Sequence, residues 1–211
     1  MTTTAIVLLV IAAVMAVLDW VAVARHIAVL EYASKPAATV ALLATAASLD
    51  VPHGTPWTWR LIALAFCVLG DVFLMLPRDA FVPGLASFAV AQILFTVSFL
   101  TGDTELSRLL VGLVVAIPVA ALLARRFVGA MRTKGHSDLV APVVVYVVVI
   151  SAMAVGAVAS GSVVAIAGAV IFMVSDSLIA ESRFVRERAW HSVGIMVTYH
   201  VALAGLVLGL L

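Results

Sequence analysis

Charged residues are scarce in this chain of 211 residues, and their scarcity excludes an ordinary water-soluble domain. Only 11% of the residues are Asp, Glu, Lys or Arg, whereas soluble domains contain about 25%. Apolar residues make up 65%, the mean hydropathy is +1.26, and the apolar residues form long blocks. A soluble fold of this length could not hide so much apolar surface from water. The sequence therefore predicts a polytopic membrane protein.

Several chemical features are also missing. Cys67 is the only cysteine, which excludes an intramolecular disulfide and a cysteine-based metal cluster. The net charge of +1 gives no strong field that would attract nucleic acid. The first residues hold no basic segment and no signal-peptide cleavage site, so we expect the first apolar block to be a retained helix. Nucleophile-elbow, phosphate-loop, zinc-protease and dinucleotide motifs are absent from the sequence, so an enzyme built on this chain would use carboxylates.

The apolar blocks predict an all-α bundle of eight transmembrane helices that forms a single integral membrane domain, residues 1–211. A spanning helix needs about 20 mostly apolar residues, and the alternation typical of a membrane β-barrel is not seen in the sequence. We expect the second block to extend back towards Ile27, with Pro36 either kinking that helix or opening it at its first turn. The expected spans are Ala5–Ala24, Pro36–Leu49, Trp59–Leu76, Phe81–Leu100, Leu109–Leu123, Leu139–Ala159, Val163–Ala180 and Val193–Leu211.

The distribution of basic residues predicts the orientation of the bundle. Ten Lys and Arg residues lie in alternate connections on one side, and the other side holds only Arg60 and Arg108. Cytoplasmic loops of membrane proteins carry the excess of Lys and Arg. Both termini are therefore expected on the non-cytoplasmic side.

A short internal similarity is consistent with a parallel repeat of four plus four helices. The segment Gly70–Leu74 in the third block resembles Ser175–Ile179 in the seventh, and both blocks run in the same direction, as a parallel repeat requires. Chance explains a single matched pentapeptide as well, so the repeat stays an open alternative.

Three acidic residues lie inside apolar blocks: Asp19, Asp71 and Asp176. A carboxylate at a helix centre costs about 2.5–3.5 kcal/mol on insertion scales, so such a residue faces the bundle interior and usually has a function. Asp71 and Asp176 lie at similar distances from the cytoplasmic ends of their helices. We therefore expect the third and seventh helices to pack together and to hold both carboxyl groups around a hollow that lipid can reach. A local pair with Arg25 explains Asp19 equally well.

Arg78 and Arg183 each follow one of these acids by seven residues, which is two turns along the same helical face. At that distance the guanidinium groups reach the headgroup zone, where Arg donates two parallel hydrogen bonds to phosphate. Ordinary snorkelling to the interface also explains both arginines, and it is the simpler interpretation.

The acids have a structural alternative as well, since polar side chains on neighbouring helices would satisfy them. His200 is better explained as such an interhelical hydrogen-bonding residue than as a metal ligand, because no second His or Cys lies at ligand spacing. The polar residues considered as structural partners of the acids are Tyr146, Tyr199, Gln92 and His200.

Several short motifs follow one another along the chain in a set order: Lys35-Pro36, Leu69–Leu76, Phe81, Gly84–Phe88, Gly168–Phe172, Ser175–Ala180, Arg183-Phe184 and Tyr199. This ordered set resembles the YhhN family of lysoplasmalogenase-like membrane proteins. The resemblance implies hydrolysis of the vinyl ether bond of lysoplasmalogens to a fatty aldehyde and a glycerophospho-alcohol, with no metal or organic cofactor.

The same resemblance implies roles for individual residues. The two acidic motifs of the family fall on Asp71 and Asp176, as catalytic residues, and its Lys-Pro motif falls on Lys35. The chain departs from the family pattern at two places. Gln92 stands where a histidine is expected, and Tyr199 is followed by His200, whereas a glutamine is expected soon after the tyrosine. The substrate-binding residues expected on these grounds are Lys35, Arg78, Gln92, Arg183, Tyr199 and His200.

The chemistry of vinyl ether cleavage suits two buried carboxyl groups. Protonation of the β-carbon creates an oxocarbenium ion, water captures it, and the hemiacetal collapses to aldehyde and alcohol. One carboxyl must stay protonated, which burial beside a second acid favours, and one must be ionised to stabilise the cation and to take a proton from water. We expect the lysophospholipid substrate to enter laterally from the cytoplasmic leaflet, and the sequence indicates no protein or nucleic-acid partner.

Two other functions stay open on the sequence alone. One is a proton-coupled transporter of lipids or small molecules, in which the acids carry protons and the two repeats move relative to each other during transport. Such transporters contain helices that are interrupted near the middle of the membrane, whereas Pro118 and Pro142 are expected near helix ends, which speaks against this function. The other is a non-catalytic membrane scaffold or lipid-binding protein.

Overall fold

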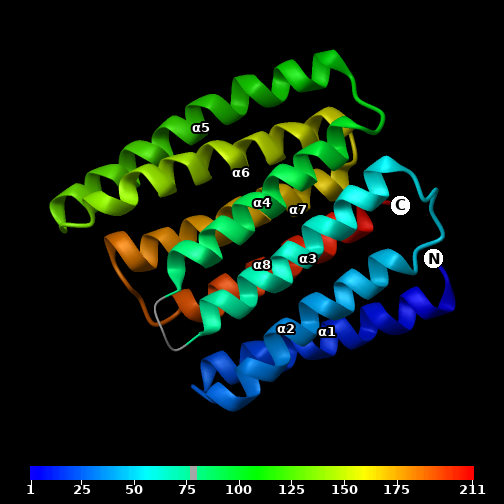
Figure 1. The fold of residues 1–211 in the computed structure, drawn as a ribbon, viewed down its shortest axis with the longest axis horizontal. Coiled ribbons are helices and arrows are strands. Elements are labelled where there is room, and N and C mark those ends of the chain that lie inside the picture. Colours follow the sequence, from blue (N-terminus) through cyan, green and yellow to red (C-terminus); the bar gives the residue numbers. More distant parts are fainter. Residues whose placement is uncertain (77–79) are drawn as a thin grey trace.

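The computed structural model describes residues 1–76 and 80–211, and within them the chain forms eight long α-helices and no strand (Figure 1). A 3₁₀ turn, η1 (Ser137–Leu139), precedes α6, and a π-helical turn, η2 (Glu181–Val185), follows α7. The helices are α1 (Thr3–Ala24), α2 (Ala28–Ala47), α3 (Thr55–Met75), α4 (Phe81–Leu100), α5 (Leu106–Thr133), α6 (Val140–Ser160), α7 (Val163–Ala180) and α8 (His191–Leu208).

Among the described residues, seven helices are long and apolar enough to cross a membrane, which confirms a helical multi-pass membrane protein. The exception is α2, although its 20 residues suffice for a span. Its lower hydropathy has a physical cause: Ser34, Lys35, Thr39 and Thr45 are all buried. Because α2 packs against α1, α3 and α8, these polar side chains face protein rather than lipid.

The structure decides between the two alternatives for Pro36 and corrects the expectation for Pro118. Pro36 lies inside α2, so the helix does extend back as expected and does not open at the proline. Pro118 lies within α5, not near a helix end, and α5 continues beyond Leu123 to Thr133. The extension buries Phe127 and Met131 in an apolar cluster with Phe184, and the exposed Arg126 guanidinium donates hydrogen bonds of 2.8 and 2.7 Å to the Glu181 carboxylate of η2.

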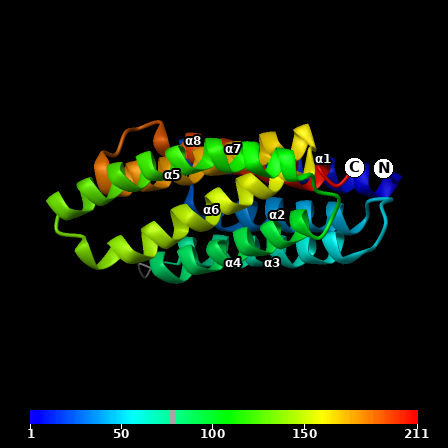
Figure 2. The same ribbon diagram turned by 90° about the horizontal axis from the view of Figure 1, so that it is seen from above.

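The helices form two layers that face each other across the interior (Figure 2). One layer contains α1, α8 and α7, and the other contains α2, α3 and α4; α6 joins the layers by packing on both α4 and α7, and α5 packs on the outer side of α6. The expectation that α3 and α7 pack against each other is therefore wrong. The main neighbours of α3 are α2 and α4, and those of α7 are α6 and α8.

The layering still places both acids of interest at one end of the bundle. Asp71 and Asp176 each lie four residues before the end of their helices, at Met75 and Ala180. This is the end opposite to the one where both termini lie (Figure 1).

Close packing of α7 on α8 depends on two glycines that face each other. A Cβ on Gly168 would lie 2.8 Å from the backbone nitrogen of Leu206, and a Cβ on Gly205 would lie 2.9 Å from Cα of Gly168. Small residues allow such close approach of membrane helices, where packing rather than water drives association. Asp176 lies on α7 and Tyr199 lies on α8, so the close contact at these glycines determines how the two residues are positioned relative to each other.

We predict that Gly168→Ala destabilises the protein, because backbone atoms of α8 must move to accommodate the new methyl group. Overpacking of this kind costs about 1–3 kcal/mol, which lowers the melting temperature of a protein of this size by several degrees. Thermal unfolding of the purified protein measures the change. Gly129→Ala is the control, since nothing lies within 4 Å of a Cβ there; equal melting temperatures of the two variants would contradict the packing argument.

Candidate functional site

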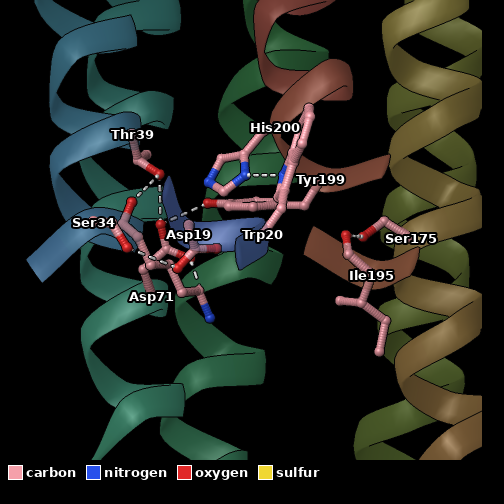
Figure 3. A network of polar contacts seen from close by, with 10 residues as sticks. Asp19, Trp20, Ser34, Thr39, Asp71, Ser175, Ile195, Tyr199 and His200 are labelled. Atoms are coloured by element: carbon pink, nitrogen blue, oxygen red, sulfur yellow. Dashed lines mark hydrogen bonds and ion pairs between the residues drawn. The ribbon is translucent and has the colours of Figure 1, made fainter. Parts of the chain in front are cut away.

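Asp71 is the centre of a polar cluster to which α2, α3 and α8 contribute (Figure 3). The carboxyl is completely buried. Its Oδ2 accepts hydrogen bonds of 2.6 Å from Thr39 Oγ1 and 2.9 Å from the Tyr199 hydroxyl. Its Oδ1 lies 3.8 Å from Nζ of Lys35. Lys35 and Thr39 are four residues apart on α2 and so share one helical face, which turns the polar face of α2 towards Asp71.

Asp19 of α1 belongs to the same cluster. It is fully buried, its Oδ1 accepts a hydrogen bond of 3.2 Å from Ser34 Oγ, and it lies close enough to Lys35 for electrostatic attraction. No ion pair joins it to Arg25 in the described part of the chain. The positive charge of Lys35 therefore attracts two buried carboxyl groups that come from different helices. This attraction offsets part of the free energy that is needed to bury the three charged groups.

His200 lies beside this cluster but has different partners. Trp20 Nε1 of α1 donates a hydrogen bond of 3.1 Å to Nδ1 of His200, as Figure 3 shows. The neighbouring Tyr199 turns instead towards Asp71. Consecutive residues on a helix point about 100° apart, which explains why Tyr199 and His200 serve different sites.

Asp176 lies in a second site, formed by α4, α5, α6 and α7. The Tyr146 hydroxyl of α6 donates a short hydrogen bond to Oδ2 of Asp176. The preceding residue, Ser175, donates to the backbone oxygen of Ile195 on α8 at 3.1 Å, so α7 presents Ser175 to α8 and Asp176 to α6.

An apolar cleft with a cavity volume of about 50 Å³ opens beside Asp176 and Tyr146. The other lining side chains are almost all aliphatic or aromatic, among them Leu85, Phe88, Leu123, Phe127, Val147 and Phe184. A carboxyl and a phenol on the wall of an otherwise apolar cleft suit a lipid that carries one reactive polar bond.

The two carboxyl groups do not share a hydrogen-bond partner within the described ranges. Three aromatic rings pack together between their sites: Phe88 and Phe172 lie 6.3 Å apart, and each lies within 6 Å of Tyr199. The expected common hollow is thus replaced by an aromatic core, because α4 and α7 send phenylalanines into the interior. Tyr199 touches both sites, since its hydroxyl binds Asp71 and its ring packs on Phe88 of the cleft wall.

The remaining sequence-predicted residues fall in three different settings. Gln92 is fully buried, and neither its Oε1 nor its Nε2 has a hydrogen-bond partner among the described residues. Arg183 of η2 is exposed and stacks over the ring of Phe81 with Cζ 4.1 Å from the centroid; Phe81 in turn lines the cleft. Arg78 lies outside the described residues.

Sequence reasoning missed the direct partners of the acids. Thr39 and Ser34 were not expected at the site, and Tyr146 was considered only as a structural partner. A usable signal existed: Lys35 and Thr39 lie four residues apart, on one face of a largely apolar helix, and Ser34 is adjacent to Lys35. No group of three or more His, Cys, Asp or Glu side chains is arranged to hold a metal ion in the part of the chain that the structure describes.

The chain is similar in sequence to several curated proteins. Similar curated proteins include the lysoplasmalogenases of Mycobacterium bovis and Mycobacterium tuberculosis, each 34% identical over 171 residues, and lysoplasmalogenase TMEM86B of Homo sapiens, 30% identical over 140 residues. The aligned regions cover 78% of this chain and 65% of each mycobacterial protein, and 66% of this chain and 58% of the human protein. The chain thus spans slightly less than two thirds of these relatives. No solved structure matches it significantly.

A family model matches residues 30–210, a range that includes Lys35, Asp71, Asp176 and Tyr199 and begins after Asp19. Since this match covers all but residues 1–29 and residue 211, the chain belongs to the YhhN family.

Proposed function

We propose that this protein is a membrane hydrolase that cleaves the vinyl ether bond of lysoplasmalogens. The observation that carries the proposal is the cleft beside Asp176: a partly buried carboxyl, bonded to Tyr146, on the wall of an apolar cleft. Three similar proteins, from two mycobacteria and from human, bear the name lysoplasmalogenase, which supports the choice of substrate.

In the proposed reaction Asp176 acts as both acid and base. Its carboxyl donates a proton to the β-carbon of the vinyl ether, and the resulting carboxylate stabilises the oxocarbenium ion. Water then adds to the cation and gives its proton back to Asp176. The hemiacetal collapses to the fatty aldehyde and the glycerophospho-alcohol, so the net change is addition of one water. Tyr146 keeps the carboxyl oriented towards the cleft, and no metal or organic cofactor is needed.

We assign Asp71 a positioning role, with Lys35 as its counterion. Asp71 holds the Tyr199 hydroxyl, and the Tyr199 ring supports Phe88 on the cleft wall. Lys35 is only 5% exposed, so it is better placed to hold Asp71 than to reach a headgroup phosphate. This assignment modifies the expectation that both acids touch the substrate.

The headgroup is proposed to lie near η2. Arg183 stacks over Phe81, which lines the cleft, and a guanidinium at this end of the cleft suits a phosphate group. Gln92 is buried near Tyr146, and we propose that its amide orients the attacking water. The single chain of the lysolipid would then occupy the apolar part of the cleft.

We further propose that residues 1–211 form one domain in which all eight helices cross the membrane, with both termini on the non-cytoplasmic side. Both termini lie at one end of the bundle (Figure 1), as an even number of crossings requires. The parallel repeat gains support from the equivalent places of Asp71 and Asp176, each bonded to the second helix of its own half, α2 or α6.

We predict that Asp176→Asn lowers aldehyde release from a lysoplasmalogen by at least about 100-fold, because the amide cannot donate a proton to carbon. Aldehyde formation by the purified protein in detergent or nanodiscs is the measurement. Asp138→Asn, an exposed acid in the α5–α6 connection, is the matched control and should leave the rate unchanged. Full activity of Asp176→Asn would reject the mechanism, and proton flux without turnover would favour a transporter.

We predict that Lys35→Met destabilises the protein more than the double variant Lys35→Met/Asp71→Asn. Removal of one partner of a buried pair leaves an uncompensated charge and costs about 3–5 kcal/mol, whereas removal of both costs less. Thermal unfolding of the two variants and of wild type measures this difference. A Lys35→Met protein with unchanged stability and a raised KM would instead indicate that Lys35 binds the phosphate.

We predict that Arg25→Cys and Asp50→Cys, which flank α2, react from opposite sides of the membrane. A membrane-impermeant maleimide should label Asp50→Cys in intact cells and Arg25→Cys only after permeabilisation. The native Cys67 is buried and gives little background, which the wild type controls. Labelling of both positions from one side would show that α2 does not cross.

A further inference from the structure

Two glycines allow close contact between α3 and α4 on the wall of the cleft beside Asp176. The two helices run side by side (Figure 1). A Cβ on Gly70 of α3 would lie 2.7 to 2.9 Å from three ring atoms of Phe88 on α4, and a Cβ on Gly84 of α4 would lie 2.6 Å from Cδ2 of Leu74 on α3. Phe88 and Leu74 both line the cleft. Each glycine therefore makes room for a cleft-lining side chain of the other helix.

Phe88 lies at the same depth in the bundle as Asp176. Phe81 of α4 and Phe184 of η2 pack edge to face with their ring centroids 5.8 Å apart, so these two residues mark a common level. From there the rise along α4 to Phe88 is roughly 10 Å, and the rise back along η2 and α7 to Asp176 is roughly 12 Å. Both residues line the cleft. The ring of Phe88 is thus part of the wall at the level of the carboxyl group.

The neighbours of the Phe88 ring direct any displacement of this ring into the cleft. The ring makes edge-to-face contacts with Phe172 of α7 and Tyr199 of α8, at centroid distances of 6.3 and 5.8 Å. Gly70 borders it on a third side, and the cleft borders it on another. Because protein interiors are closely packed, the two aromatic neighbours resist displacement. A methyl group on Gly70 would therefore push the ring of Phe88 towards the cavity.

We infer that Gly70 is a specificity-determining residue, which sets through Phe88 how much bulk the cleft accepts next to the reacting bond. The inference rests on the proposed function for the place of the vinyl ether beside Asp176. The cavity volume is only about 50 Å³, so a single added methyl group is significant there. The substrate class that fits is a lysoplasmalogen whose alkenyl chain is unbranched at the carbon next to the vinyl group.

The test compares two lysoplasmalogens that share a headgroup. One carries a straight hexadecenyl chain, and the other carries a methyl branch on the third carbon of that chain. Aldehyde release gives kcat/KM for each. We expect wild type to prefer the straight chain by about tenfold or more, which is the usual effect of one methyl group in an apolar pocket. Phe88→Leu should remove most of this preference.

A second-site variant shows whether Gly70 acts through Phe88. Gly70→Ala should lower kcat/KM for the straight chain by about tenfold, and the double variant Gly70→Ala/Phe88→Leu should restore it. Gly156→Ala is the control for overpacking elsewhere: its Cβ would lie 3.3 Å from Cβ of Phe99, and it does not line this cleft. It should keep the wild-type preference. A preference unchanged by Phe88→Leu, or a loss in Gly70→Ala that Phe88→Leu does not restore, would overturn the inference.

Binding without turnover separates this inference from the proposed activity. The probes are the saturated ether analogues of the two lipids, and the measurement is the rise in melting temperature of the full chain in detergent, since a ligand that binds the folded state stabilises it. The straight analogue should stabilise wild type more than the branched one, and Phe88→Leu should respond equally to both. This pattern in a protein that releases no aldehyde would refute only the activity. Aldehyde release with equal stabilisation of wild type by both analogues would overturn only the role of Gly70.

Discussion

Polar side chains buried between membrane helices must satisfy one another, because lipid offers no hydrogen bonds and screens no charge. The structure depends on this constraint most clearly at Lys35. Its ammonium lies 3.8 Å from Oδ1 of Asp71 and close enough to Asp19 for electrostatic attraction, while Thr39 and Tyr199 donate hydrogen bonds to Oδ2 of Asp71. Four helices therefore have to assemble together, since none of these groups is stable in lipid alone. Helix α2, with its buried polar side chains, is held in the bundle by the same contacts.

The surroundings of the two acids differ, and the difference supports the separate roles that we propose for them. Asp71 accepts hydrogen bonds on Oδ2 from α2 and α8, and it is not part of the lining of the cleft beside Asp176. Among the described residues, Asp176 accepts a hydrogen bond from Tyr146 and faces that cleft. A carboxyl that must change its protonation during a reaction needs a free path to substrate, whereas a carboxyl that holds a framework needs fixed partners. This contrast is why we assign proton transfer to Asp176 and positioning to Asp71.

Hydropathy predicted the helices well, since lipid imposes length and apolarity on each span, and it predicted that Asp71 and Asp176 face the interior. The lateral order of helices was not predictable, because each helix offers several apolar faces that pack equally well. α3 and α7 were therefore placed together, although Phe88 and Phe172 fill the space between their acids. The partner of Asp19 was missed for a similar reason: Arg25 is near in sequence, while Lys35 approaches only after α1 and α2 fold back on each other.

The most direct test of the account is a structure of the protein with a saturated ether lysophospholipid, which resembles the substrate but lacks the reactive double bond. The account predicts the ether oxygen and the adjoining carbon beside Asp176 and Tyr146, with the phosphate towards Arg183 and the chain in the cleft between α4 and α7. An ether group located at Asp71 and Lys35, or a lipid bound only on the outer surface of the bundle, would contradict it.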